Sequence, residues 1–169
     1  VKILIEHGAA VNSSANYTYA STPLQLAAEN GNIEIVKQIL IHSADVNAAP
    51  NDCYGATALQ FAAIGGYVGV AKLLLENHAD VDFPLAILGG RTALEAAAEH
   101  GRLDMVQLLI NWGADVTGPG QQQYDRAVEL AKSNGHMALS RVLERYHAWS
   151  STFLGQGDFQ LLDNLVGMD

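Results

Sequence analysis

The feature that most restricts how this chain can fold is a sequence period of about 35 residues. One short phrase occurs as AAVN, ADVN, ADVD and ADVT, starting at Ala9, Ala44, Ala79 and Ala114, each 35 residues after the last. A second phrase, TPLQLAAENG from Thr22, returns in step with the first and always ends in glycine. Two independent phrases with one period indicate a repeat protein, in which each unit packs on the next.

Each unit reads as a pair of short antiparallel helices. In the first complete unit, an apolar stripe at i, i+3 and i+4 (Leu24, Ala27 and Ala28) stops at Gly31, the residue type best suited to the left-handed turn that closes a helix. A second stripe with helical spacing follows over residues 33–40. Alanines let the first helix approach its neighbours closely, whereas the second helix is bulkier, and this asymmetry predicts a curved stack.

These phrases resemble the ankyrin repeat, whose pattern runs Thr-Pro-Leu, two alanines, a glycine, an apolar second helix and a closing Gly-Ala-Asp-Val-Asn. The wording GGRTALEAAAEHG from Gly89 is also similar to C-terminal ankyrin arrays of large fungal multidomain proteins. The resemblance implies an all-α ankyrin-repeat solenoid of stacked antiparallel helix pairs with projecting finger loops. The expected units are a half repeat at 1–21, full repeats at 22–56, 57–91 and 92–125, a degenerate repeat at 126–146, and a capping tail at 147–169.

The chain departs from the family pattern at a few positions. The helix-starting proline is kept at Pro23 and replaced by alanine in the other units. Ser43 and His78 stand where other units have a glycine after the second helix, which predicts either left-handed backbone strain or a different helix termination there. Glutamine or glutamate replaces the usual histidine at Gln25, Gln60, Glu95 and Glu129. Because of these last changes, the hydrogen-bonding pattern of the loops does not follow from the family pattern, whereas the expected fold is unaffected.

Composition limits the partners of such a stack. With 9 Lys and Arg against 18 Asp and Glu, the formal net charge is −9, so the chain lacks the basic face that nucleic-acid binding requires. No apolar run approaches the roughly 20 residues that span a bilayer, so no membrane is expected as a partner. The lone cysteine, Cys53, favours an intracellular compartment, cytoplasm or nucleus. The acidic balance instead predicts a basic protein partner, bound more weakly as salt rises.

Recognition is expected at the variable positions of the fingers and first helices, because repeat-defining residues are buried between units. Carried over from the family, these positions are Tyr19, Tyr54, Arg91, Glu29, Asn30, Ile64, Glu99 and His100. Tyr19 and Tyr54 are the best anchors, since aromatic side chains dominate interface energetics. The alternative is that each tyrosine packs on the adjacent finger. Gln123 and Asp125 are expected in a further finger of the last repeat.

The finger that begins at Asp82, DFPLAILGG, is apolar where a loop is normally polar. Its candidate contact residues are Phe83, Leu85, Ile87 and Leu88. An exposed apolar patch of this kind marks an interaction site, either for a foreign partner or for self-association with a second copy of the chain. The alternative is that Phe83 and Ile87 fold back over the neighbouring fingers as a small local core.

The tail carries a short amphipathic pattern in which Phe159, Leu162, Leu165 and Val166 share one side. One interpretation is a helix that caps the open end of the last repeat, which a solenoid requires. The other is an acidic and apolar effector segment of a transcription-linked regulator, docking into a groove on a partner. We favour the cap.

No residue pattern indicates catalysis. The histidines lack metal-ligand spacing, and His7, His42 and His78 follow the period of the repeat. Glu95 and Glu99 lie one helical turn apart and could share a proton, but paired acids on an exposed helix are ordinarily solvated. The segment GPGQQQ lacks the lysine of a phosphate-binding loop. We therefore expect no catalytic residue, metal or cofactor, and a module that recognises proteins.

Overall fold

A threonine starts the first helix of each complete repeat and explains why the repeated phrase begins where it does. The computed structural model describes residues 3, 7–13 and 21–152. In this structure, the backbone amide of Gln25 donates to Thr22 Oγ1 at 3.3 Å, and the backbone amide of Thr22 donates to Gln25 Oε1 at 2.8 Å. The same reciprocal arrangement, a capping box, opens the helices that follow Thr57 and Thr92. Each box satisfies amide groups that a helix start leaves without partners.

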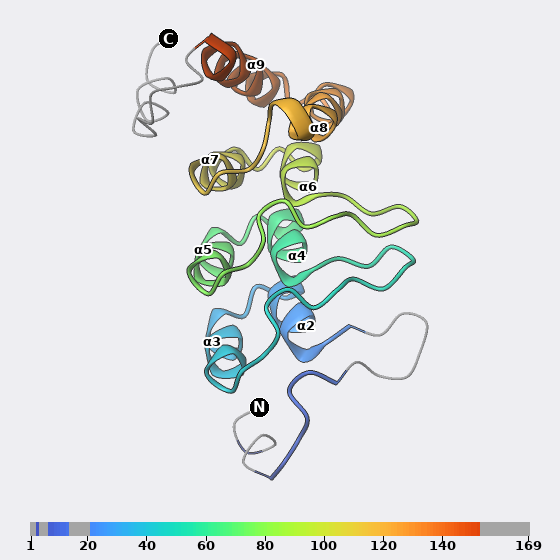
Figure 1. Cartoon of the computed structure of the whole chain (residues 1–169), viewed down its shortest axis with the longest axis vertical. Helices are drawn as coiled ribbons and strands as arrows, with labels where there is room; N and C mark the ends of the chain where they lie inside the picture. The colour runs from blue at the N-terminus through green and yellow to red at the C-terminus, as the bar shows by residue number, and fades with distance from the viewer. Residues whose placement is uncertain (1–2, 4–6, 14–20, 153–169) are drawn as a thin grey trace.

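Helix pairs follow one another along the described part of the chain (Figure 1). The helices are α2 (Pro23–Glu29), α3 (Ile33–Ile41), α4 (Ala58–Gly65), α5 (Val68–Glu76), α6 (Ala93–Glu99), α7 (Leu103–Asn111), α8 (Gln121–Ser133) and α9 (Met137–Thr152). A single 3-10 turn, η1 (Gly118–Gly120), immediately precedes α8. Within these residues, β-structure is limited to one isolated bridge, so the predicted all-α fold is confirmed.

The helices form two columns. In the first column α2 packs on α4, α4 on α6 and α6 on α8, while α3, α5 and α7 form the second column (Figure 1). Loops project from the side of the first column, among them the 48–56 finger and the 83–91 finger (Figure 1). Fully buried alanines such as Ala28, Ala62 and Ala97 lie in the first column, and bulkier buried residues such as Ile39 and Leu74 lie in the second. The predicted asymmetry between the two helices of a repeat is therefore present.

The turn between the two helices of a repeat requires glycine for two reasons. Gly31 and Gly66 have φ of 67° and 74°, in the left-handed region that other residues avoid. In addition, the next repeat occupies the space that a side chain would need. The Tyr67 ring lies 2.6 Å from where a Cβ atom of Gly31 would stand, and Arg102 Cδ lies 2.8 Å from that of Gly66. Neighbouring repeats are thus in contact at the turns as well as through the helices.

The turn after the second helix carries the strain predicted from the sequence. Ser43 and His78 have φ of 61° and 67°. An asparagine of the preceding repeat holds each of these residues. Asn12 Nδ2 donates to Ser43 O at 3.2 Å, and Asn47 Nδ2 donates to His78 O at 3.0 Å. Contacts between repeats therefore help to keep non-glycine residues in this conformation.

The last repeat differs from the others in a way that the sequence analysis did not predict. After Thr117 the chain passes through η1 directly into α8, which begins at Gln121. Gln123 and Asp125 lie within this helix, so their assignment to a further finger is wrong. α9 packs on α8 and continues past residue 146 to Thr152. The rings of Tyr124 and His147, one from each helix, stack with their centroids 4.2 Å apart.

Candidate functional site

Gln25 and Gln60 show how the fingers are held to the helices. Each side chain closes its capping box through Oε1 and donates through Nε2 to carbonyl oxygens of the next finger. Gln60 Nε2 lies 2.9 Å from Phe83 O and 3.2 Å from Pro84 O. Gln25 Nε2 lies 3.0 Å from Ala48 O in the same way. Both glutamines are buried, so the base of each finger has a fixed position relative to the helix beneath it.

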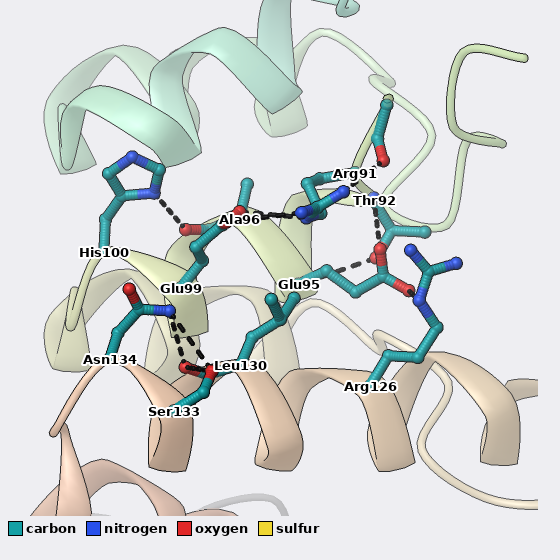
Figure 2. A network of polar contacts seen from close by, with 11 residues as sticks. Arg91, Thr92, Glu95, Ala96, Glu99, His100, Arg126, Leu130, Ser133 and Asn134 are labelled. Carbon is teal, nitrogen blue, oxygen red and sulfur yellow. Dashed lines mark hydrogen bonds and ion pairs between the residues drawn. The ribbon is translucent and has the colours of Figure 1, made fainter. Parts of the chain in front are cut away.

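Glu95 occupies the same repeat position but has no amide group to donate. Glu95 is 1% exposed. Its Oε2 atom accepts a hydrogen bond from the backbone amide of Thr92 at 3.2 Å, and its Oε1 atom lies 3.3 Å from Arg126 Nε (Figure 2). Burial raises the pKa of Glu95 above its ordinary value, while Arg126 and the Thr92 hydrogen bond lower this pKa in part. The exchange of glutamine for glutamate matches a change of neighbour, because α8 stands here instead of a further finger.

Glu99 and Arg91, both predicted partner-binding residues, form an ion pair with each other. Arg91 Nε lies 2.9 Å from Glu99 Oε2, and Arg91 Nη2 lies 3.3 Å from Glu99 Oε1 (Figure 2). Glu95 and Glu99 thus each form an ion pair with a different arginine. The interpretation of these two acids as a solvated pair is wrong for Glu95, because α6 is covered by its neighbours on the side that carries this residue.

Three apolar side chains are exposed together at the ends of the fingers. Tyr54 is 77% exposed, Ile87 76% and Leu88 55%, and we call these three residues the tip patch. The Tyr54 amide donates to Leu88 O at 2.8 Å, which joins the two fingers at their ends. The Tyr54 ring also lies directly over Gly89. Tyr54 therefore both packs on the adjacent finger and presents surface to solvent.

The apolar residues of the 83–91 finger divide into two groups. Phe83 and Leu85 are half-buried and Ala86 is buried, at the base of the finger. Ile87 and Leu88 point outward. The alternative that Ile87 folds back over the neighbouring fingers into a local core is wrong, because this residue stays exposed beside the 48–56 finger.

The remaining predicted contact residues lie at the ends of the first helices. Glu29 and Asn30 are exposed at the end of α2, and Ile64 is half-buried in α4. Asn30 Nδ2 donates to Leu26 O at 2.7 Å. His100 is exposed at the end of α6, with Nδ1 3.0 Å from Ala96 O (Figure 2). The Asn30 and His100 side chains therefore contact carbonyls at the ends of their helices while they remain open to solvent.

Leu26 and Tyr67 are among the exposed residues that the sequence analysis missed. Leu26 is about half exposed on α2, and Tyr67 is exposed where α5 begins. The sequence does indicate the exposure of Leu26, because this residue falls outside the apolar stripe of its helix. Tyr67 carried no such signal, since its position follows from its contact with a turn one repeat earlier in the chain.

Some predictions concern residues that the structure does not describe. Tyr19 lies outside the described residues, as do the tail candidates Phe159, Leu162, Leu165 and Val166. Within the described ranges, no helix is long and apolar enough to cross a membrane. The same ranges contain no group of three or more His, Cys, Asp or Glu placed to hold a metal ion.

The columns, capping boxes and fingers define a helical repeat solenoid. A comparison with protein families finds that the model described as ankyrin repeats, in three copies, matches residues 1–84 and 48–119. The chain therefore belongs to the ankyrin-repeat family, as its sequence phrases predicted. Ankyrin repeats are generally protein–protein interaction modules, and the family is typically non-catalytic. No curated protein matches the chain.

Proposed function

We propose that this chain binds a partner protein through the tip patch and the exposed ends of its first helices, without chemistry of its own. The observation that carries this proposal is the exposure of Tyr54, Ile87 and Leu88 side by side at the ends of two fingers. Aromatic and aliphatic side chains of this size supply most of the binding free energy in protein interfaces. A cluster of them in solvent has a free-energy cost that a partner would remove.

The backbone beneath the tip patch is suited to binding because it is already ordered. The Leu88 amide donates to Asp52 O at 3.0 Å, in addition to the bond from the Tyr54 amide. Gln60 anchors the base of the same finger. A surface held in place before binding loses less conformational entropy when a partner arrives. The fingers therefore need little rearrangement to present these side chains.

The charge of the chain favours a basic partner. The formal net charge is −9, and Asp52 is exposed beside the tip patch. Attraction between opposite charges accelerates association, and this attraction weakens as salt screens the charges. We expect affinity to fall between about 50 and about 300 mM salt, over which the screening length shortens by more than half. An affinity that stays constant over this range contradicts the basic-partner part of the proposal.

The test uses the whole chain and a library of displayed linear peptides. Enriched peptides are synthesised and titrated against the wild type, against the Ile87→Ser/Leu88→Ser variant, and against Ile41→Ser. Ile41 is a matched control because it is 73% exposed but lies on α3, in the other column. We expect the tip variant to bind at least about tenfold more weakly, as for loss of hot-spot residues, and the control to bind as the wild type does.

Charged substitutions at the same two positions decide between a foreign partner and a second copy of the chain. Light scattering gives the solution mass of the wild type and of Ile87→Asp/Leu88→Asp. A wild-type dimer that the variant converts to a monomer assigns the tip patch to self-association. Peptides that bind all three titrated proteins equally would refute a role for the tip patch in recognition.

A further inference from the structure

The 48–56 and 83–91 fingers are joined at their ends by one isolated bridge. The pairing is a parallel bridge between Cys53 and Leu88. Leu88 donates to Asp52 O at 3.0 Å and accepts from the Tyr54 amide at 2.8 Å. Both backbone groups of Leu88 face the earlier finger, so the carbonyl of Ile87 and the amide of Gly89, which share planar trans peptide units with Leu88, face the opposite way.

Those two neighbours, Ile87 and Gly89, form an edge that is ready to pair. They lie 35 residues after Asp52 and Tyr54, the two residues that hold Leu88. The backbone is similar at the equivalent positions, with φ of 56° at Tyr54 and 70° at Gly89. The carbonyl of Ile87 and the amide of Gly89 make no hydrogen bond with any described residue. The edge that binds a strand on the 48–56 finger is therefore repeated, without a partner, on the 83–91 finger.

No strand of the described chain fills this edge, because the last repeat has no finger. The residue 35 positions after Leu88 is Gln123, which lies in α8 and donates through Nε2 to Asp82 Oδ1 at 2.7 Å. Figure 1 shows that the 83–91 finger is the last one before α8. The space between them is an open hollow of about 700 Å³, lined on the finger side by Pro84 and Leu85. Leu85 lines the hollow and lies two residues before Ile87 on the same finger, so an extended segment of a few residues can reach from the edge to the hollow.

The hollow has an acidic character that selects among extended segments. Its ionisable lining residues are Asp82, Glu95, Asp115 and Arg126. The Arg126 charge is engaged by Glu95 at 3.3 Å. Asp82 accepts hydrogen bonds from the Asp115 amide at 3.1 Å and from Gln123, and neither donor carries a charge. The two aspartates therefore leave a net negative charge, complementary to a lysine or arginine.

We propose that an extended basic segment of a partner protein binds as an added strand on the Ile87–Gly89 edge, with a lysine or arginine directed into the adjoining hollow. The segment would donate to Ile87 O and accept from the Gly89 amide, as Leu88 does with Asp52 and Tyr54. Strand addition draws its affinity from the backbone bonds and its specificity from the side-chain pocket. This inference rests on the proposed function, and it adds the conformation and the charge of the bound segment.

The test follows amide hydrogen exchange by NMR in the whole ¹⁵N-labelled chain. The probe is a peptide with blocked ends, KFPLAILGGR, which is a lysine followed by the sequence of residues 83–91 and therefore contains the strand that the 48–56 finger binds. One control peptide is N-methylated at the leucine copied from Leu88, which removes the donor to Ile87 O. A second control has glutamate in place of the lysine and arginine.

In the free protein we expect slow exchange at the Tyr54 amide, which is bonded, and fast exchange at the Gly89 amide. Saturating probe should slow Gly89 by at least about tenfold and leave Tyr54 unchanged, as for a new backbone hydrogen bond. N-methylation should weaken binding about tenfold, because one donor is lost and its acceptor stays unsatisfied. Asp82→Asn, which restores the residue type of positions 12 and 47, should weaken the basic probe about two- to fivefold.

Each outcome bears on a different part of the reasoning. Binding of the probe without slower exchange at Gly89 overturns strand addition but leaves recognition by the tip patch intact. Strand addition is also overturned if the probe does not bind, or if exchange slows at the Tyr54 amide in place of the Gly89 amide. Equal binding of the glutamate peptide overturns the basic character of the segment. Failure of the tip variant to weaken selected peptides, by contrast, counts against the proposed function and not against the edge.

Discussion

Replacing Arg126 with alanine is expected to destabilise the fold by about 2 kcal/mol at neutral pH, because Glu95 would keep a buried charge without its partner. At the 3.3 Å that separates Arg126 Nε from Glu95 Oε1, two unit charges attract by about 1 kcal/mol in water and about 5 kcal/mol at an effective dielectric constant of 20. Glu95 is buried but Arg126 is partly exposed. The expected loss therefore lies between these limits.

The loss is expected to depend on pH with a definite sign. Burial raises the pKa of Glu95 above 4.5, and the Arg126 charge lowers it, so Arg126→Ala raises this pKa further. A carboxyl group whose pKa is higher in the folded state takes up a proton on folding, at any pH between the two pKa values. Stability then falls as pH rises through that window. The effect of Arg126→Ala should be largest above the folded pKa and smallest near pH 4.5.

Urea unfolding followed by circular dichroism, at pH of about 5 and about 7.5, measures this difference. Lys132→Ala is the control, because Lys132 pairs with Glu144 at 2.6 Å on the exposed surface and should contribute only about 0–1 kcal/mol. Adding Glu95→Gln to Arg126→Ala should restore most of the stability, since the neutral glutamine removes the unpaired buried charge. A loss that is equal at both pH values, or that glutamine does not rescue, would refute the reasoning.

Two further changes test the contacts between repeats. Gln60→Glu removes the donor to Phe83 O and Pro84 O and turns a carboxylate toward them, so unfolding should be easier by about 2–3 kcal/mol in a urea titration; an unchanged midpoint would show that the finger does not depend on this side chain. Ser43→Gly relieves a φ of 61° and should raise stability by about 0.5–1 kcal/mol in thermal unfolding, whereas a lower melting temperature would mean that the serine conformation carries no strain.

The repeat, the helices and most of their ends could be predicted from short-range residue patterns. These features depend on residues a few positions apart, such as Thr22 with Gln25, or on one residue's backbone preference, as at Gly31. They also benefit from the geometry of a solenoid, in which each unit contacts only its neighbours, so a period in the sequence becomes a period in space. For this reason, the column of small residues and the column of large ones could be predicted before the structure was known.

The neighbour of each finger, in contrast, could be found only from the packing of the folded chain. Gln60 and Glu95 share a repeat position, yet one binds a finger and the other an arginine of α8, because the chain after Thr117 enters a helix early. The exposure of Ile87 and the unpaired edge at Gly89 have the same origin. Each depends on a neighbour 30 or more residues away that breaks the period. A periodic pattern predicts what the next unit repeats, but it contains no information about the point at which the next unit stops repeating it.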